Sequence, residues 1–264
     1  AAVRANPRDP QARASLGRFL AARGAIRVGA VLIEEARFFG GDSASLAREL
    51  LLLYERLGDY KAVVGVEPDL LTPAERQRGL WLAEHPPRVA LRDRAARLTY
   101  RSARSDGGFG TVLVRISGTE LAAVIDPRVS GVVLSASNRS DIRMFGDSTS
   151  VLGVATIRIG GTGFENIVAT IAPTGGATKV GFDVIAPYAP TFDPRAGTIT
   201  LHRPDSRWRP PAGTRVPALF DRDGVRLLFG GVWLPSTASN VSIMLSSRRW
   251  TWDTRRGDLV LLSP

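Results

Sequence analysis

The chain has 264 residues, and its 35 Lys and Arg against 25 Asp and Glu give a formal net charge of +10. Only Lys61 and Lys179 are lysines, so 33 of the cations are arginine. The absence of cysteine excludes disulfides, thiolate zinc sites, iron–sulfur clusters and cysteine nucleophiles, while 44% hydrophobic residues predict a folded core rather than disorder.

The first 86 residues predict a stack of helical hairpins. Apolar residues recur at spacings of three and four, with breaks at Gly24 and Gly58. Sliding the segment along itself by 34 residues aligns these two glycines and places Leu16 on Leu50. Helical pairs repeated at this period bury an apolar face by stacking on the next pair. The segment resembles a tetratricopeptide-like stack of about two repeats, and an unrelated helical bundle is the alternative.

Residues 87–109 predict an arginine-rich linker, because they end in a run of Ser, Asp and Gly. Beyond residue 110 the apolar period changes to two, with strands expected at 112–116 and 121–125 and further strand signals up to 261. The predicted fold class is therefore α+β multidomain. The predicted parts are a helical segment at 1–86, a linker at 87–109, a mostly-β barrel domain at 110–201, and a β extension or shortened second lobe at 202–264.

Charge follows this division of the chain. Residues 110–201 are neutral, whereas 91–109 carry +3 and 202–264 carry +5. The excess of arginine therefore surrounds the central β segment.

One strand-end aspartate carries the strongest chemical signal. Asp126 follows the apolar hairpin of 112–125, and the segments 180–185 and 191–201 supply an apolar-Gly-x-Asp run and a second hairpin. In this order and spacing, residues 110–201 resemble the retropepsin-like aspartic proteases. The resemblance implies a retropepsin-like barrel and Asp126 as the catalytic carboxylate.

The loop after Asp126 departs from the pattern of that family. Pro127 and Arg128 stand where the family has Thr and Gly. Proline offers neither a hydroxyl nor an N–H, and a neighbouring guanidinium keeps a carboxylate ionised, whereas aspartic proteases share one proton between two carboxylates. We expect a chain that is not an enzyme. If it is an active aspartic endopeptidase, the second carboxylate comes from Asp126 of another copy, or from Asp221 or Asp223.

The C-terminal segment echoes the β domain. Residues 251–261 repeat 191–201 at an offset of 60, and 216–224 read as an echo of the strand that ends at Asp126. A shortened second lobe and a simple hairpin both explain this pattern. Asp-Gly turn chemistry favours the hairpin.

Two clusters interleave arginine with tryptophan. Such residues anchor protein interfaces, and they also stack on bases or seat phosphates. We expect protein contacts, with an anionic membrane surface as an alternative, and nucleic acid is disfavoured because no nucleic-acid-binding motif is present. The residues of the expected contact surface are Arg207, Trp208, Arg209, Arg248, Arg249, Trp250 and Trp252.

No cofactor or metal is expected, because His85 and His202 are the only histidines and lie far apart. No apolar run approaches the ~20 residues of a membrane span. The start at Ala1 fits either a processed mature end, from which a signal or anchor was removed, or a trimmed edge, and an exported protein, periplasmic or membrane-peripheral, is favoured over a cytoplasmic one. The sequence thus predicts a non-catalytic scaffold or accessory subunit, a pseudo-protease that binds other protein subunits in a larger, membrane-associated assembly. An active peptidase and a binder of anionic lipid or nucleic acid are the alternatives.

Overall fold

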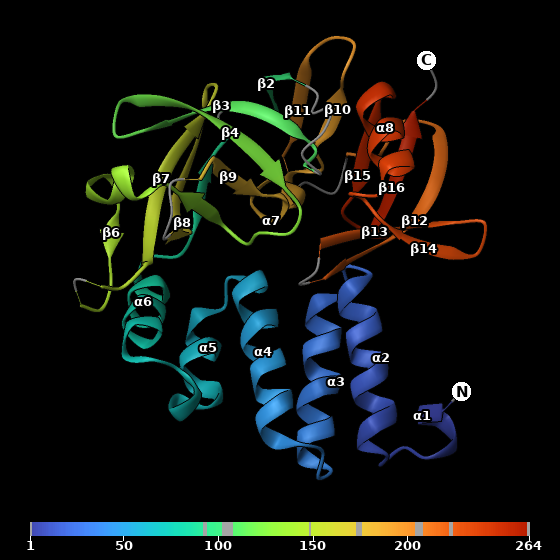
Figure 1. Cartoon of the computed structure of the whole chain (residues 1–264). Helices are drawn as coiled ribbons and strands as arrows, with labels where there is room; N and C mark the ends of the chain where they lie inside the picture. The colour runs from blue at the N-terminus through green and yellow to red at the C-terminus, as the bar shows by residue number, and fades with distance from the viewer. Residues whose placement is uncertain are drawn as a thin grey trace. The chain divides into compact units, whose positions relative to one another are not determined.

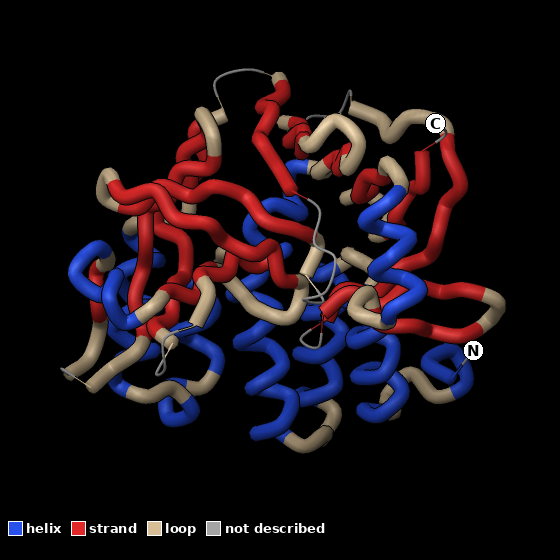
Figure 2. The backbone as a smooth tube through the Cα atoms, turned by 45° about the horizontal axis from the view of Figure 1, so that its top comes forward, coloured by secondary structure: helices blue, strands red, loops and turns tan. Residues whose placement is uncertain are grey.

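The computed structural model describes residues 2–91, 94–101, 108–147, 149–172, 176–203, 208–221 and 224–262. The chain forms two compact units, one of residues 1–86 with 145–148 and one of residues 87–144 with 149–264. Helices build the first unit and strands dominate the second (Figure 1, Figure 2). The predicted α+β division agrees with this arrangement.

Four of the helices described in the first unit begin at polar side-chain caps. Asp42 accepts a hydrogen bond from the first turn of its helix, and Thr72 and Glu75 form a reciprocal capping box. Gly58 adopts the left-handed conformation that ends a helix. The helices are α1 (Ala2–Ala5), α2 (Pro10–Ala22), α3 (Ile26–Phe38), α4 (Ser43–Leu57), α5 (Tyr60–Val66) and α6 (Pro73–Glu84), with a 3₁₀ turn, η1, at Pro68–Leu70.

The helix pair α2 and α3 packs closely through glycine. A Cβ added to Gly29 would lie 2.6 Å from the carbonyl oxygen of Gly17, so the two backbones touch directly. Helix starts follow the 34-residue period closely, since α2 and α4 begin at residues 10 and 43 and α3 and α5 at 26 and 60. Leu50 is buried with residues of α3, whereas its counterpart Leu16 is 37% exposed on α2. The tetratricopeptide resemblance itself stays a prediction.

Six strands of the second unit close into a barrel. The predicted hairpin forms β3 (Gly110–Ile116) and β4 (Thr119–Asp126), and the ring runs β3-β4-β9-β5-β8-β7 before β7 pairs with β3 again. Its other members are β5 (Val132–Leu134), β7 (Leu152–Ile159), β8 (Thr162–Ile171) and β9 (Thr178–Gly181). Short elements beside the ring are β1 (Arg88–Ala90), which pairs with β8, β6 (Arg143–Met144), which pairs with β7, and the 3₁₀ turn η2 (Ala136–Asp141).

The predicted linker at 87–109 is wrong for much of its length. Besides β1, it contains β2 (Ala95–Arg101), which pairs with β3 on one side and with β11 (Thr198–His202) on the other. Leu98 and Tyr100 are buried on one face of β2 while its arginines point away from the core. The prediction failed because the arginines on the solvent face of β2 make its composition resemble that of a linker, although its other face is buried. Residues 102–107 lie outside the described part.

Residues after the barrel extend its sheet. Following α7 (Phe182–Ile185) and the 3₁₀ turn η3 (Ala186–Tyr188), the strand order is β2-β11-β10-β15-β16-β12-β13-β14. The bounds are β10 (Thr191–Asp193), β12 (Gly213–Asp221), β13 (Gly224–Phe229), β14 (Val232–Pro235), β15 (Trp250–Asp253) and β16 (Asp258–Leu262). A helix that the sequence analysis missed, α8 (Ser239–Ser247), precedes β15. One hydrophobic cluster joins this sheet to the barrel.

A local two-fold relates the two closing hairpins. Strands β10 and β15 pair antiparallel with Thr191 opposite Thr251, its equivalent at the offset of 60 residues. The flanking strands repeat the relation, because Thr200 of β11 faces Arg97 of β2 and Val260 of β16 faces Arg215 of β12. The meander β12-β13-β14 thus corresponds in register to β2-β3-β4.

Candidate functional site

The end of β4 places Asp126 at the inner edge of the barrel. Strand β9 runs parallel to β4, with Gly181 opposite Asp126, and the side chain of Asp126 is 1% exposed. Lys179, two residues before Gly181, reaches the same carboxylate. Parallel pairing of β4 and β9 therefore brings a cation from a segment more than 50 residues away to the predicted catalytic position.

Both oxygens of the Asp126 carboxylate are occupied. Arg128 donates its backbone N–H and Nε–H to Oδ1 at 2.9 and 2.8 Å and its Nη2–H to Oδ2 at 2.8 Å. The ammonium of Lys179 lies 3.1 Å from Oδ2. Burial alone would raise the pKa of Asp126, but the hydrogen bonds from Arg128 and Lys179 outweigh it and hold this pKa below its ordinary value. The carboxylate is a closed, ionised anchor for the loop.

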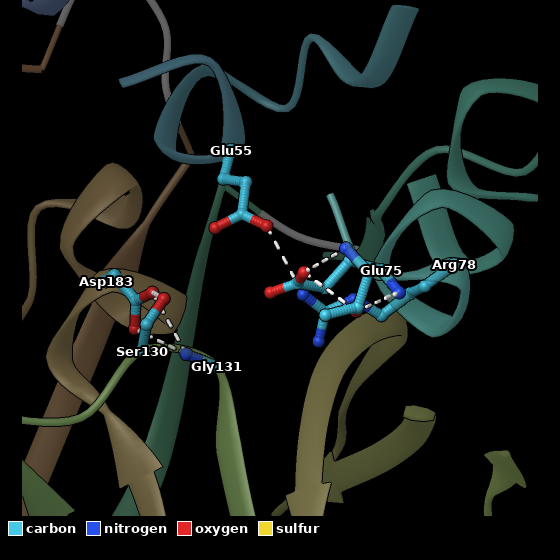
Figure 3. Close-up of polar contacts among 7 residues, drawn as sticks. Glu55, Glu75, Arg78, Ser130, Gly131 and Asp183 are labelled. Carbon is cyan, nitrogen blue, oxygen red and sulfur yellow. Dashed lines mark hydrogen bonds and ion pairs between the residues drawn. The ribbon is translucent and has the colours of Figure 1, made fainter. Parts of the chain in front are cut away.

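Asp183 fixes the other end of the same loop. Its carboxylate accepts hydrogen bonds from the Ser130 hydroxyl at 2.7 Å and from the Gly131 backbone N–H at 3.0 Å, as Figure 3 shows. Gly181 also donates its N–H to the Gly131 carbonyl at 2.6 Å. In the sequence, Asp183 belongs to the apolar-Gly-x-Asp run of 180–185, and this role was not predicted. The sequence feature that could have indicated this role is the position of the Asp183 carboxylate, two residues after Gly181.

The C-terminal half places no carboxylate at the position that matches Asp126. Val112 of β3 and Leu227 of β13 are equivalent in strand register. Val112 pairs with Ala123 of β4 and Leu227 pairs with Leu234 of β14, so Ala123 corresponds to Leu234. Three residues further, Asp126 corresponds to Thr237, and residues 234–240 contain neither Asp nor Glu. The predicted echo at 216–224 is wrong, since that segment corresponds to β2 and the start of β3.

Asp221, one of the two aspartates predicted as alternative partners, lies at the turn from β12 to β13. The backbone of Asp221 ends β12 opposite Gly224, and Asp223 lies outside the described residues. This turn does approach the Asp126 loop, because a Cβ added to Gly224 would lie 3.2 Å from the Pro127 carbonyl oxygen.

The local two-fold carries a chain of buried hydroxyl groups. The Thr191 hydroxyl donates to Oγ1 of Thr251 at 2.9 Å, and Thr251 donates to the Pro190 carbonyl at 3.1 Å. His202 Nε2 lies 3.2 Å from Oγ1 of Thr191, and burial holds the pKa of His202 below its ordinary value. The neutral imidazole therefore completes a structural chain of polar contacts.

Trp250 and Trp252 are not surface residues, which corrects the predicted contact set. Trp250 is 0% and Trp252 5% exposed, and Trp250 stacks on Phe192 with ring centroids 4.0 Å apart. Trp250 also packs edge-on against Phe109, and Trp252 packs edge-on against Phe182, so aromatic side chains contact both rings. Trp208 packs against His202, with ring centroids 4.7 Å apart, and Arg209 is exposed, while Arg207 lies outside the described residues.

Arg248 and Arg249 do lie on the surface, at an open cleft of about 600 Å³ between the β10–β11 turn and the end of α8. Nε of Arg249 is 3.6 Å from a carboxylate oxygen of Asp193. The lining residues are Asp193, Arg195, Ala196, Ser247, Arg248, Arg249 and Leu262.

Neither a metal site nor a membrane span is found in the described ranges. No group of three or more His, Cys, Asp or Glu gathers there as a metal ion would require. None of the helices described combines the length and the apolar character needed to cross a bilayer.

Comparison with known proteins finds matches among solved structures alone. No protein-family model and no curated protein sequence matches the chain. Among solved structures, the crystal structure of a retropepsin-like aspartic protease from Rickettsia conorii aligns with 44% of this chain and 91% of that chain, at 12% identity and a TM-score of 0.30.

Proposed function

We propose that this protein is a non-catalytic, protease-like binding module that acts as a scaffold or accessory subunit. The observation that carries this proposal is the Asp126 carboxylate, whose two oxygens are engaged by Arg128 and Lys179. Catalysis by a carboxylate pair needs one shared proton and access to a water. A lowered pKa and 1% exposure of Asp126 oppose both requirements.

The local two-fold adds a second argument. In the chain itself the place equivalent to Asp126 is held by Thr237, which cannot share a proton as a carboxylate does. A second copy that approached along this two-fold would need the edge of β10, where β15 already pairs. These two features support a fold that is kept for its surface rather than for hydrolysis.

A proteolysis assay tests the proposal directly. Purified full chain is incubated with casein and with a peptide library at acidic and at neutral pH, and products are followed by mass spectrometry. We expect no cleavage above the background of the Asp126→Asn variant. Cleavage by the native chain that Asp126→Asn abolishes would refute the proposal and establish an aspartic endopeptidase.

The identity of the partner requires a separate experiment. We propose protein subunits of a larger, membrane-associated assembly, since interface anchors are rich in arginine and the arginine excess borders the neutral barrel. Affinity capture from membrane and soluble fractions should retain a defined protein set with the membrane fraction. Retention on heparin or acidic vesicles that falls steeply with salt, without a bound protein, would instead support the alternative of an anionic binder.

A further inference from the structure

The cleft between the β10–β11 turn and α8 has a composition that none of the buried sites shares. Arg195, Arg248 and Arg249 line it, together with one carboxylate, that of Asp193. All three arginines are exposed residues. Its volume of about 600 Å³ falls in the range of roughly 300–1,000 Å³ that ligand pockets occupy.

The cations of this cleft are available to a ligand. Arg249 faces Asp193 across 3.6 Å, which is longer than a hydrogen bond. Within the described part of the chain, the guanidinium groups of Arg195 and Arg248 form neither a hydrogen bond nor an ion pair. By contrast, Arg128 and Arg215 are each committed to a buried carboxylate. The cleft thus contains three guanidinium groups, two of which have no protein acceptor among the described residues.

We infer that this cleft binds an acidic peptide segment that also carries an apolar side chain. Guanidinium groups bind carboxylates through paired hydrogen bonds, which accounts for the three arginines. Leu262 offers an apolar contact in the lining, and the Asp193 carboxylate can accept an N–H from a peptide backbone. The same carboxylate repels a compact dianion such as a phosphate, so a peptide fits the whole set better than a lipid headgroup or nucleic acid.

This inference rests on the proposed binding function and names the chemistry of its partner. The local two-fold supplies a matched control, because the turn at 254–257 is the equivalent of the turn at 194–197. Arg256 in that turn is exposed and is absent from the lining of the cleft. Removing Arg256 therefore changes the net charge without changing the cleft.

The test measures fluorescence anisotropy of a labelled peptide of about ten alternating glutamate and leucine residues, titrated with full-length protein. We expect binding that weakens about tenfold in Arg195→Ala and in Arg248→Ala, since each loses a charge-assisted hydrogen bond. Arg256→Ala should bind within about twofold of the native chain. Circular dichroism of each variant verifies that it is folded.

Three outcomes would overturn the inference: no binding of the peptide, equal weakening by Arg256→Ala, or tighter arginine-dependent binding of an oligonucleotide or of anionic vesicles. Cleavage of the peptide would refute the non-catalytic function alone. Binding is therefore also measured with Asp126→Asn, in which the arginine dependence can be judged whether or not the native chain is a peptidase.

Discussion

Replacing Asp126 by Asn removes the charge at the candidate site and preserves the size of the side chain. In the native chain this carboxylate is 1% exposed and is contacted by Arg128 and Lys179, whose side chains are 45% and 37% exposed. Breaking a fully buried ion pair costs about 3–5 kcal/mol because a charge is left without a partner. Here both cations can turn to water, so we expect Asp126→Asn to lower the free energy of unfolding by about 1–3 kcal/mol at pH 7.

The pH dependence gives the sharper test. Because the pKa of Asp126 is lowered in the folded state, its contribution to stability is full above the unfolded pKa of about 3.9 and is lost as pH falls through the folded pKa. The cost of Asp126→Asn should therefore stay constant from pH 7 down to about pH 4 and shrink as the pH falls further. Urea unfolding followed by the fluorescence of the buried Trp250 and Trp252 measures it, with Glu120→Gln in an exposed ion pair as the control. A variant that is more stable than the native chain at pH 7, as expected for a carboxyl with a raised pKa, would refute the reasoning.

Three further substitutions test packing, two of them in the strand-rich unit and one in the helical unit. Trp250→Ala should lower the free energy of unfolding by about 3–5 kcal/mol in urea titrations, because the ring is fully buried against Phe192. Thr251→Val should cost about 1–2 kcal/mol in the same assay, since it removes the hydroxyl that joins the two hairpins. Gly29→Ala should lower the thermal midpoint of the helical unit, because its Cβ would lie 2.6 Å from a backbone oxygen, whereas Gly65→Ala in open space should leave it unchanged or raise it.

Local sequence patterns predicted the elements whose hydrogen bonds form within one short segment. They did not predict elements whose burial depends on distant parts of the chain. The hairpin of β3 and β4 followed from the alternating spacing that this segment contains within itself. Strand β2 did not, because its arginines line the face that points away from Leu98 and Tyr100, and only its partners β3 and β11 show that the other face is buried. Helix α8 was missed since its nine residues include four serines and lack a side-chain cap.

The same limit explains the candidate site. The sequence places Arg128 two residues from Asp126, so their ion pair could be anticipated from neighbouring positions. Lys179 and Asp183 reach the loop only because β9 lies parallel to β4, which is a tertiary fact. Trp250 and Trp252 were predicted on the surface because both lie in an arginine-rich segment. Aromatic side chains from other segments pack against both rings and bury them instead.

The arginines behind the net charge of +10 include two kinds, whose removal should affect stability and binding separately. Arg128 and Arg215 each pair with a carboxylate that is at most 4% exposed, so their removal should alter stability. Arg195 and Arg248 are exposed and have no protein acceptor in the described residues, so their removal should alter binding and leave unfolding nearly unchanged. Because the barrel segment is neutral, a binding field at the cleft arises from its own arginines and not from a diffuse excess over the chain.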